Sequence, residues 1–226
     1  MPGSSRRDVN AMRVIASALG VCAGVSGLEH GFFEILQGNA QTPGLFVQSI
    51  GPAQRIWVYG TEDAFTLVST FLASGLLSVA IGAPIIAWSI LFVDAKNGPG
   101  VCLLLGWLLF LVGGGVAQIG FVVLCWAILR RIGRPLAWPR KLLPADIRGT
   151  LSRLWPGALV ASLALSAFAL EIAIFGFVPG VTDPDRARLV CWSALGVMLP
   201  VLLAGVVGGS ERDSERAAEA SQPPGG

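Results

Sequence analysis

The chain has 226 residues, of which 54% are hydrophobic and only 13% are charged, and its mean hydropathy is +0.69. Soluble globular domains usually carry about a quarter charged residues, and disordered chains carry more charge and fewer apolar residues. The net charge of +2 is too small to indicate a nucleic-acid partner. We therefore expect an integral membrane protein.

Apolar segments long enough to cross a bilayer recur along the chain. About 20 apolar residues in a helix cross a hydrocarbon core of about 30 Å. Helices satisfy every backbone hydrogen-bonding group within the segment, so the expected fold is an all-α integral membrane bundle. A soluble N-terminal arm (1–11) and a disordered C-terminal tail (209–226) flank it. The expected segments are 12–36, 64–93, 101–129, 157–178 and 189–208.

The third segment decides how many times the chain crosses the membrane. It contains a glycine triad, a place where a helix can break: Gly113, Gly114 and Gly115. As one tilted helix it gives five spans, and the glycines let a neighbouring helix pack closely. As a re-entrant hairpin it gives four spans. In that arrangement 13 of the 16 Lys and Arg residues lie on one side, and Arg55, Arg186 and Arg188 lie on the other. The positive-inside rule favours the hairpin, but both arrangements remain open.

The loop 130–156 holds the densest group of basic residues in the chain. Apolar residues between positions 142 and 154 fall mostly on one helical face, which is typical of a short amphipathic helix in the headgroup region. In this interpretation the loop binds anionic lipids of the bilayer. The alternative is an ordinary cytoplasmic loop without lipid specificity.

Ionisable residues inside the apolar segments are few: Glu29, His30, Glu34 and Glu171. Charges at membrane depth are costly and usually line an interior or a transport pathway. At about 100° per residue, His30 and Glu34 are expected on one side of the first helix and Glu29 on the opposite face. We do not place Glu171 in the same site.

The pair of His30 and Glu34 has three open interpretations. It forms a proton relay or a cation-binding element, because histidine changes its charge near neutral pH. It holds the helix in a fixed register through polar contacts. Or it lies close enough to the helix end to be solvated at the membrane interface.

Small residues also give the first helix a stripe along which a second helix can approach: Gly20, Gly24, Gly27 and Gly31. At the start of the second segment, Thr61 is expected to cap the helix. Glu62 and Asp63 would then occupy its first turn, where the helix dipole favours negative charge.

The sequence contains no motif of a common enzyme or metal site. The four cysteines are scattered singly, without a C-x-x-C pair, and are expected to be packing residues. One histidine cannot supply a multi-histidine ligand set, and no phosphate loop or dinucleotide fingerprint is present. We therefore assign no catalytic residue, metal or cofactor, and an enzyme is the less favoured interpretation.

Residues 27–34 (GLEHGFFE), followed by QGN at 37–39, resemble an element of small bacterial multi-pass membrane proteins of unassigned function. The glycine triad 113–115 is similar to a glycine-rich stretch of the same group. The resemblance covers most of the membrane region. It implies no activity, cofactor or substrate.

These observations predict a small transporter or channel-like protein of the bacterial inner (plasma) membrane, with His30 and Glu34 in a polar site. The alternative is a non-catalytic accessory or scaffold subunit, in which the same residues only hold helices together. That alternative implies a membrane protein partner or a homo-oligomer.

Overall fold

The computed structural model describes residues 10–93 and 95–221 of the chain. Of the expected terminal regions, residues 1–9 and 222–226 lie outside this part. The described residues form α-helices and one two-stranded antiparallel sheet, in which Val47 pairs with Ala64. In chain order the elements are α1 (Ala11–Leu36), β1 (Phe46–Gln48), β2 (Asp63–Phe65), α2 (Phe71–Leu91), α3 (Gly98–Leu111), α4 (Gln118–Leu129), α5 (Ala137–Leu142), α6 (Ala145–Phe175) and α7 (Pro184–Ala220).

Four of the described helices, α1, α2, α6 and α7, are long and apolar enough to cross a membrane. This confirms a mostly helical, membrane-embedded protein. The described residues contain no fifth helix of that length, because the apolar segment 101–129 is divided between the shorter helices α3 and α4.

The helices α3 and α4 form an antiparallel hairpin. The Sγ atoms of Cys102, near the start of α3, and Cys125, near the end of α4, are 3.3 Å apart. In one continuous helix these residues would lie about 35 Å apart along the axis. Of the two arrangements left open by the sequence, the structure therefore has the hairpin. It also brings together two cysteines that the sequence analysis had treated as isolated.

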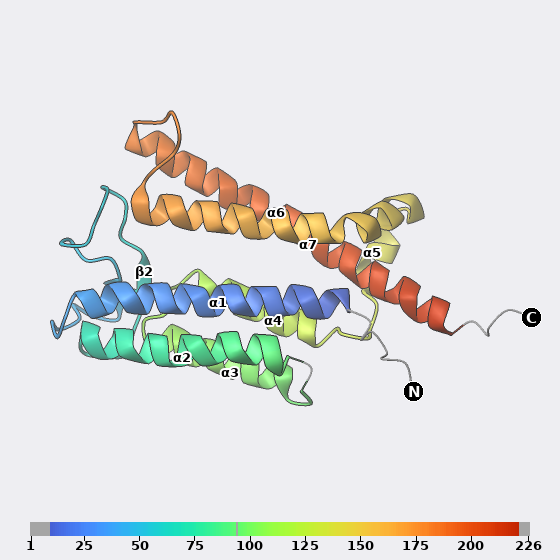
Figure 1. Ribbon diagram of the computed structural model, residues 1–226, viewed down its shortest axis with the longest axis horizontal. Coiled ribbons are helices and arrows are strands. Elements are labelled where there is room, and N and C mark those ends of the chain that lie inside the picture. The colour runs from blue at the N-terminus through green and yellow to red at the C-terminus, as the bar shows by residue number, and fades with distance from the viewer. Residues whose placement is uncertain (1–9, 94, 222–226) are drawn as a thin grey trace, which may run out of the picture.

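The helices lie in two layers (Figure 1). One layer contains α1, α2 and the α3–α4 hairpin, and the other contains the antiparallel pair of α6 and α7. The start of α1 and the end of α7 lie at the same end of the molecule. Here α7 contacts α1, since a Cβ at Gly209 would lie 2.8 Å from Cδ1 of Ile15.

The glycine stripe of α1 packs against α2. A Cβ at Gly24 would lie 2.7 Å from the carbonyl oxygen of Gly82, and one at Gly31 would lie 2.7 Å from that of Gly75. The glycines of α2 face α1 in return, with a Cβ at Gly75 only 2.5 Å from the Gly31 oxygen. Without side chains at these positions, the two backbones approach closely. The other two stripe residues, Gly20 and Gly27, face Ser89 of α2 and Leu109 of α3.

The start of α2 differs from the expectation. The helix begins at Phe71, where Thr70 serves as N-cap and its side chain accepts a hydrogen bond from the Ala73 N–H. Thr61 is therefore not the cap, and Asp63 begins β2 instead of the first helical turn. Residues 61–70 contain β2 and the N-cap, and the apolar helix starts only after them.

The last two helices are longer than their apolar segments. α6 begins at Ala145 and therefore includes most of the amphipathic stretch expected in the basic loop, while α5 forms a separate turn. α7 continues to Ala220, so the expected disordered tail is helical from residue 209 to residue 220. Buried Gly209 and Ser210 show why, because this stretch packs against α1 and the loop before α5.

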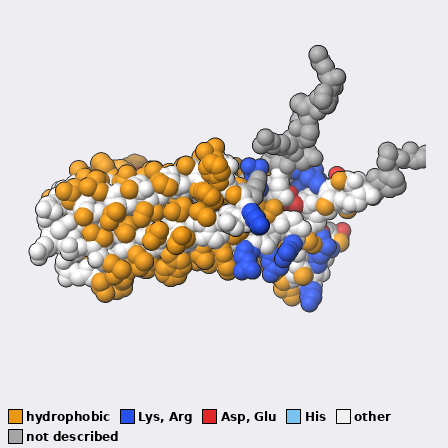
Figure 2. Space-filling view, turned by 90° about the horizontal axis from the view of Figure 1, so that it is seen from below, with side chains coloured by type: hydrophobic (Ala, Val, Ile, Leu, Met, Phe, Trp, Pro, Cys, Tyr) orange, Lys and Arg blue, Asp and Glu red, His pale blue; other side chains and the backbone are white. Residues whose placement is uncertain are grey.

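The basic side chains gather at the end of the molecule where α1 starts and α7 ends. Figure 2 shows Lys and Arg at one end of the visible face and a largely hydrophobic surface over the rest of it. We call this the basic end. At the opposite end, the loop end, lie the connection between α1 and α2 and the connection between α6 and α7.

A buried apolar cluster fills the bundle toward the basic end. It joins α1, the α3–α4 hairpin, α6 and α7 around fully buried Ile15 and Leu19. Its other buried members are Met12, Ala16, Val93, Cys102, Cys125, Ile128, Leu129, Leu159, Met198 and Leu202.

Candidate functional site

His30 lies near the loop end of α1, with only 3% of its side chain exposed. Its Nδ1 atom is 3.0 Å from the carbonyl oxygen of Ser26 and 2.9 Å from Oε2 of Glu29. A carbonyl oxygen can only accept, so Nδ1 carries the hydrogen and donates it to Ser26. This leaves Nε2 as the ring nitrogen that can gain or lose a proton.

The second nitrogen of His30 faces a carboxylate from the loop before α2. Oε2 of Glu62 lies 3.6 Å from Nε2, an ion-pair distance that is slightly too long for a hydrogen bond. Nε2 is buried and has no hydrogen-bond partner among the described residues. The imidazole therefore lies between two carboxylates, Glu29 on one side and Glu62 on the other.

This geometry corrects the expected arrangement of the acidic residues. Glu29 contacts His30 instead of pointing to the opposite face, because the side chains of adjacent residues bend toward each other. Within the described residues, the ion pairs of His30 are with Glu29 and Glu62 and not with Glu34. Glu34 is fully buried, and its Oε1 accepts a hydrogen bond from the Ser49 hydroxyl at 3.1 Å.

The tip of the α3–α4 hairpin forms the floor of this site. A Cβ at Gly113 would lie 2.6 Å from both carboxylate oxygens of Glu34, and one at Gly115 would lie 2.5 Å from Nε2 of His30. Both glycines have positive φ, +111° and +96°. Their lack of a side chain lets the backbone turn and come close to the acidic and imidazole groups. Gly114 lies against Leu109 and buried Gln118.

Hydroxyl groups hold the hairpin tip in place. The Ser74 and Ser78 hydroxyls of α2 both donate to the carbonyl oxygen of Val112, at 2.5 and 3.2 Å. Thr66 lies 3.0 Å from the Ser74 hydroxyl. This network satisfies a backbone carbonyl that the break between α3 and α4 leaves unpaired.

Glu62 is a site residue that the sequence analysis missed. Its φ of +43° lies in the left-handed region, which costs a residue with a side chain roughly 1–2 kcal/mol. Hydrogen bonds from Ser49 N to Glu62 O and from Ile50 N to Thr61 O hold this loop. Partial burial raises the pKa of its carboxyl above the ordinary value, with the charges of Glu29 and Asp63 adding to this and His30 opposing it.

Glu171, the fourth expected site residue, is not part of this cluster. It lies half-buried on α6. Within the described part of the chain, no hydrogen bond or ion pair joins it to the groups around His30. The structure thus brings together three of the four expected residues and adds Glu62.

A cavity of about 250 Å³ adjoins the cluster, between α1, α4 and the pair of α6 and α7. His30 and Glu62 form its polar part, with Ser26 and Ser166, and the remaining lining is apolar apart from two cysteines. An apolar cavity with a few polar groups is the usual form of a small-molecule site. On the side of the cavity that faces the basic end lies the apolar cluster around Ile15 and Leu19.

No group of three or more His, Cys, Asp or Glu side chains in the described residues is arranged to hold a metal ion. No protein-family model, curated protein or solved structure matches this chain. The similarity to small bacterial multi-pass proteins thus stays a prediction, and a functional assignment depends on the geometry of the site.

Proposed function

We propose that this chain is a small transporter that carries protons through the site around His30. The observation that supports this most strongly is the buried, unpartnered Nε2 of His30, which lies 3.6 Å from Glu62 and borders a cavity. A histidine can take up and release a proton near neutral pH. The carboxyl group of Glu62, opposite the free Nε2, can accept that proton in turn.

The polar groups around His30 suit proton exchange rather than a fixed structural contact. Oε1 of Glu29 and Oε2 of Glu34 are buried without a hydrogen-bond partner in the described residues, whereas Oε2 of Glu29 contacts His30. A polar clamp would be expected to satisfy such atoms, because each unpaired buried group is costly. Protons, water or a cationic solute would satisfy them in the working protein.

The position of the apolar cluster favours a transporter over an open channel. The cavity lies beside His30, but the cluster around Ile15 and Leu19 separates it from the basic end. A proton reaching His30 from the loop end therefore finds no polar route through the described residues. Transport then requires the pair of α6 and α7 to move relative to the α1–α4 layer, so that access alternates between the two sides.

The basic end faces the cytoplasm in this proposal. Lys and Arg accumulate on the cytoplasmic side of multi-pass proteins, and both described ends of the chain lie there. The His30 site then opens toward the outer side of a bacterial inner membrane.

Proton flux in proteoliposomes tests the proposal. Vesicles loaded with a pH-sensitive dye receive a pH gradient, with potassium and valinomycin to prevent charge build-up. We expect the wild type to dissipate the gradient faster than protein-free vesicles, and His30→Gln and Glu62→Gln to lose this activity. Glu171→Gln, another half-buried carboxylate change, is the matched control and should keep it.

A wild type that is correctly folded and inserted but no faster than protein-free vesicles contradicts the proposal. Equal losses in Glu171→Gln would also contradict it, because the effect would then not be specific to the cluster. Size-exclusion profiles of each variant separate loss of flux from loss of folding.

The accessory-subunit alternative is supported by a different surface. Several large apolar residues are exposed in the connection between α1 and α2, outside the long helices: Phe46 (71%), Leu67 (61%), Val58 (59%) and Ile56 (57%). Exposed apolar groups of this kind often mark contacts with another protein. Co-purification of one membrane protein in stoichiometric amount, lost on Phe46→Ser/Leu67→Ser, together with absence of flux, would favour this function.

A further inference from the structure

A second cavity, of about 420 Å³, lies at the basic end of the molecule. Its walls come from the start of α1, the loop after α4, α5 and the last turns of α7. Three arginines line it, two from the loop and one from α5: Arg131, Arg134 and Arg140. It lies at the opposite end of the bundle from His30, and nothing in the transport proposal uses it.

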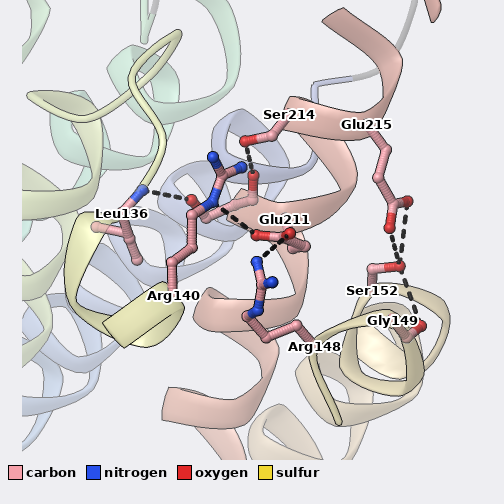
Figure 3. Close-up of polar contacts among 9 residues, drawn as sticks. Leu136, Arg140, Arg148, Gly149, Ser152, Glu211, Ser214 and Glu215 are labelled. Carbon is pink, nitrogen blue, oxygen red and sulfur yellow. Dashed lines mark hydrogen bonds and ion pairs between the residues drawn. The ribbon is translucent and has the colours of Figure 1, made fainter. Parts of the chain in front are cut away.

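The arginines of this cavity are incompletely neutralised. Within the described chain, Arg131 and Arg134 form no ion pair or hydrogen bond through their side chains and are exposed. Nε of Arg140 lies 3.4 Å from Glu211, but that carboxylate is held more closely by Arg148, at 2.7 Å (Figure 3). The positive charge of the guanidinium groups that line the cavity is thus only partly compensated by carboxylates.

The one described carboxylate in the lining, Asp213, does not offset this charge. Its two oxygens accept hydrogen bonds from the backbone N–H groups of Ala11 and Met12, at 2.7 and 3.0 Å. The positive end of the α1 dipole therefore faces this carboxylate and compensates its charge. An anion in the cavity would meet an excess of positive potential.

The loop that carries two of the arginines is fixed to α7. The Leu136 N–H donates to the Ser210 hydroxyl at 3.1 Å, and the Ser214 hydroxyl donates to the Ser210 carbonyl at 2.8 Å (Figure 3). Gly133, with φ of +73°, allows the turn between Arg131 and Arg134. The hydrogen bond from Leu136 to Ser210 fixes the end of the loop to α7 before any ligand binds, which reduces the entropy lost on binding.

Exposed apolar side chains beside the cavity indicate its depth relative to the bilayer. Trp138 and Leu142 of α5 and Ile147 of α6 are 42%, 71% and 47% exposed. Tryptophan and apolar residues next to a group of arginines are typical of the membrane interface, where lipid headgroups lie.

We propose that this cavity binds a phosphate group, held by the guanidinium groups of Arg131, Arg134 and Arg140. Guanidinium groups match the oxygens of a phosphate in pairs of parallel hydrogen bonds. The phosphate belongs either to the headgroup of an anionic phospholipid or to a soluble phosphate compound that enters from the cytoplasmic side. The chemistry of recognition is the same in both cases.

Thermal unfolding in mixed micelles tests this proposal, with the fluorescence of the seven tryptophans as the signal. The protein in a neutral detergent is titrated with phosphatidylglycerol, with phosphatidylcholine, or with inorganic pyrophosphate at constant ionic strength. The variant is Arg131→Gln/Arg134→Gln. The matched control is Lys141→Gln/Arg153→Gln, which removes the same charge from exposed positions of the same end, outside the cavity.

We expect a saturable rise of the melting temperature with phosphatidylglycerol or with pyrophosphate, and none with phosphatidylcholine. Each basic residue near anionic lipid contributes about fivefold to affinity, so half-saturation of the cavity variant should shift by roughly thirtyfold. The control should shift by much less. A response to phosphatidylglycerol alone assigns the phosphate to a lipid, and a response to pyrophosphate assigns it to a soluble compound.

The proposal is overturned if no phosphate compound raises the melting temperature of the wild type. It is also overturned if both double variants lose the same affinity, since the basic end would then attract anions only through its overall charge. Flux through the His30 site is measured separately, so failure here does not bear on the transport proposal.

Discussion

Gly115 leaves no room for a side chain beside His30: a Cβ at this position would lie 2.5 Å from the imidazole Nε2. The backbone of the hairpin tip thus packs directly against the only histidine of the chain. Since Gly115 also has φ of +96°, two independent constraints act at this position, one of space and one of backbone conformation.

Gly115→Ala should therefore destabilise the protein by about 2–4 kcal/mol, from backbone strain and overpacking together. Thermal unfolding in detergent measures the loss. Gly120→Ala, in the same hairpin but with open space around its Cβ, is the control and should unfold at or above the wild-type temperature. Similar losses in both variants would mean that the tip does not fit against His30 as described.

Glu62→Gln should change how stability depends on pH. The raised pKa of the Glu62 carboxyl means that the folded protein keeps this proton at a pH where the unfolded chain has released it. The stability that Glu62 contributes is therefore complete below its ordinary pKa and is lost as pH rises through the raised value. The groups facing it are His30, Glu29 and Asp63.

The melting temperature of the wild type minus that of Glu62→Gln should accordingly be largest below the ordinary pKa of a glutamate, about 4.3, and should fall as pH rises through the raised pKa. Glu219→Gln, at an exposed position of α7, should give a difference that hardly varies with pH. A wild-type advantage that grows with pH would show that Glu62 is stabilised in its charged form, contrary to the burial described here.

Oxidation should link the two legs of the hairpin. The sulfur atoms of Cys102 and Cys125 are 3.3 Å apart, so a mild oxidant in detergent should join them with loss of two hydrogens. Mass spectrometry of proteolytic fragments identifies the linked peptides. The pair Cys22 and Cys191 serves as the comparison, and exclusive linkage there, with Cys102 and Cys125 unjoined, would argue against antiparallel legs.

Asp213→Ala should lower stability by about 1 kcal/mol, because it leaves the first N–H groups of α1 without their acceptor. Glu219→Ala removes the same charge from the same helix and should have little effect, since no described contact depends on that side chain. The melting temperatures of the two variants are compared in one detergent, and that of Asp213→Ala should be the lower. Equal values would remove the role assigned to Asp213.

Much of the architecture follows from local sequence properties. The long apolar runs predict the membrane helices, because length and hydropathy alone decide whether a helix can cross a bilayer. The glycine stripe of α1 predicts a close approach but not its partner, since the matching residues Gly75 and Gly82 lie far away in the chain. The hairpin was one of two arrangements that the same apolar composition allows.

The site shows where such reasoning fails. Helical periodicity separated Glu29 from His30, but flexible side chains one residue apart still contact each other. Glu62 looked like the first turn of a helix, because acidic residues there are favoured by the helix dipole. Its true position depends on the long-range pairing of β1 with β2 and of the loop with Ser49, which no local pattern reveals.

The contact between Asp213 and Ala11 also has a consequence for biosynthesis. Asp213 follows Ala11 by 202 residues and therefore leaves the ribosome much later, so α1 can enter the membrane long before its first turn receives its final hydrogen-bond acceptor. Until α7 arrives, these N–H groups must bond to water or lipid headgroups. Asp213 of α7 thus supplies the acceptor that the start of α1 lacks, and a chain cut before residue 213 should have an α1 whose first N–H groups lack this acceptor.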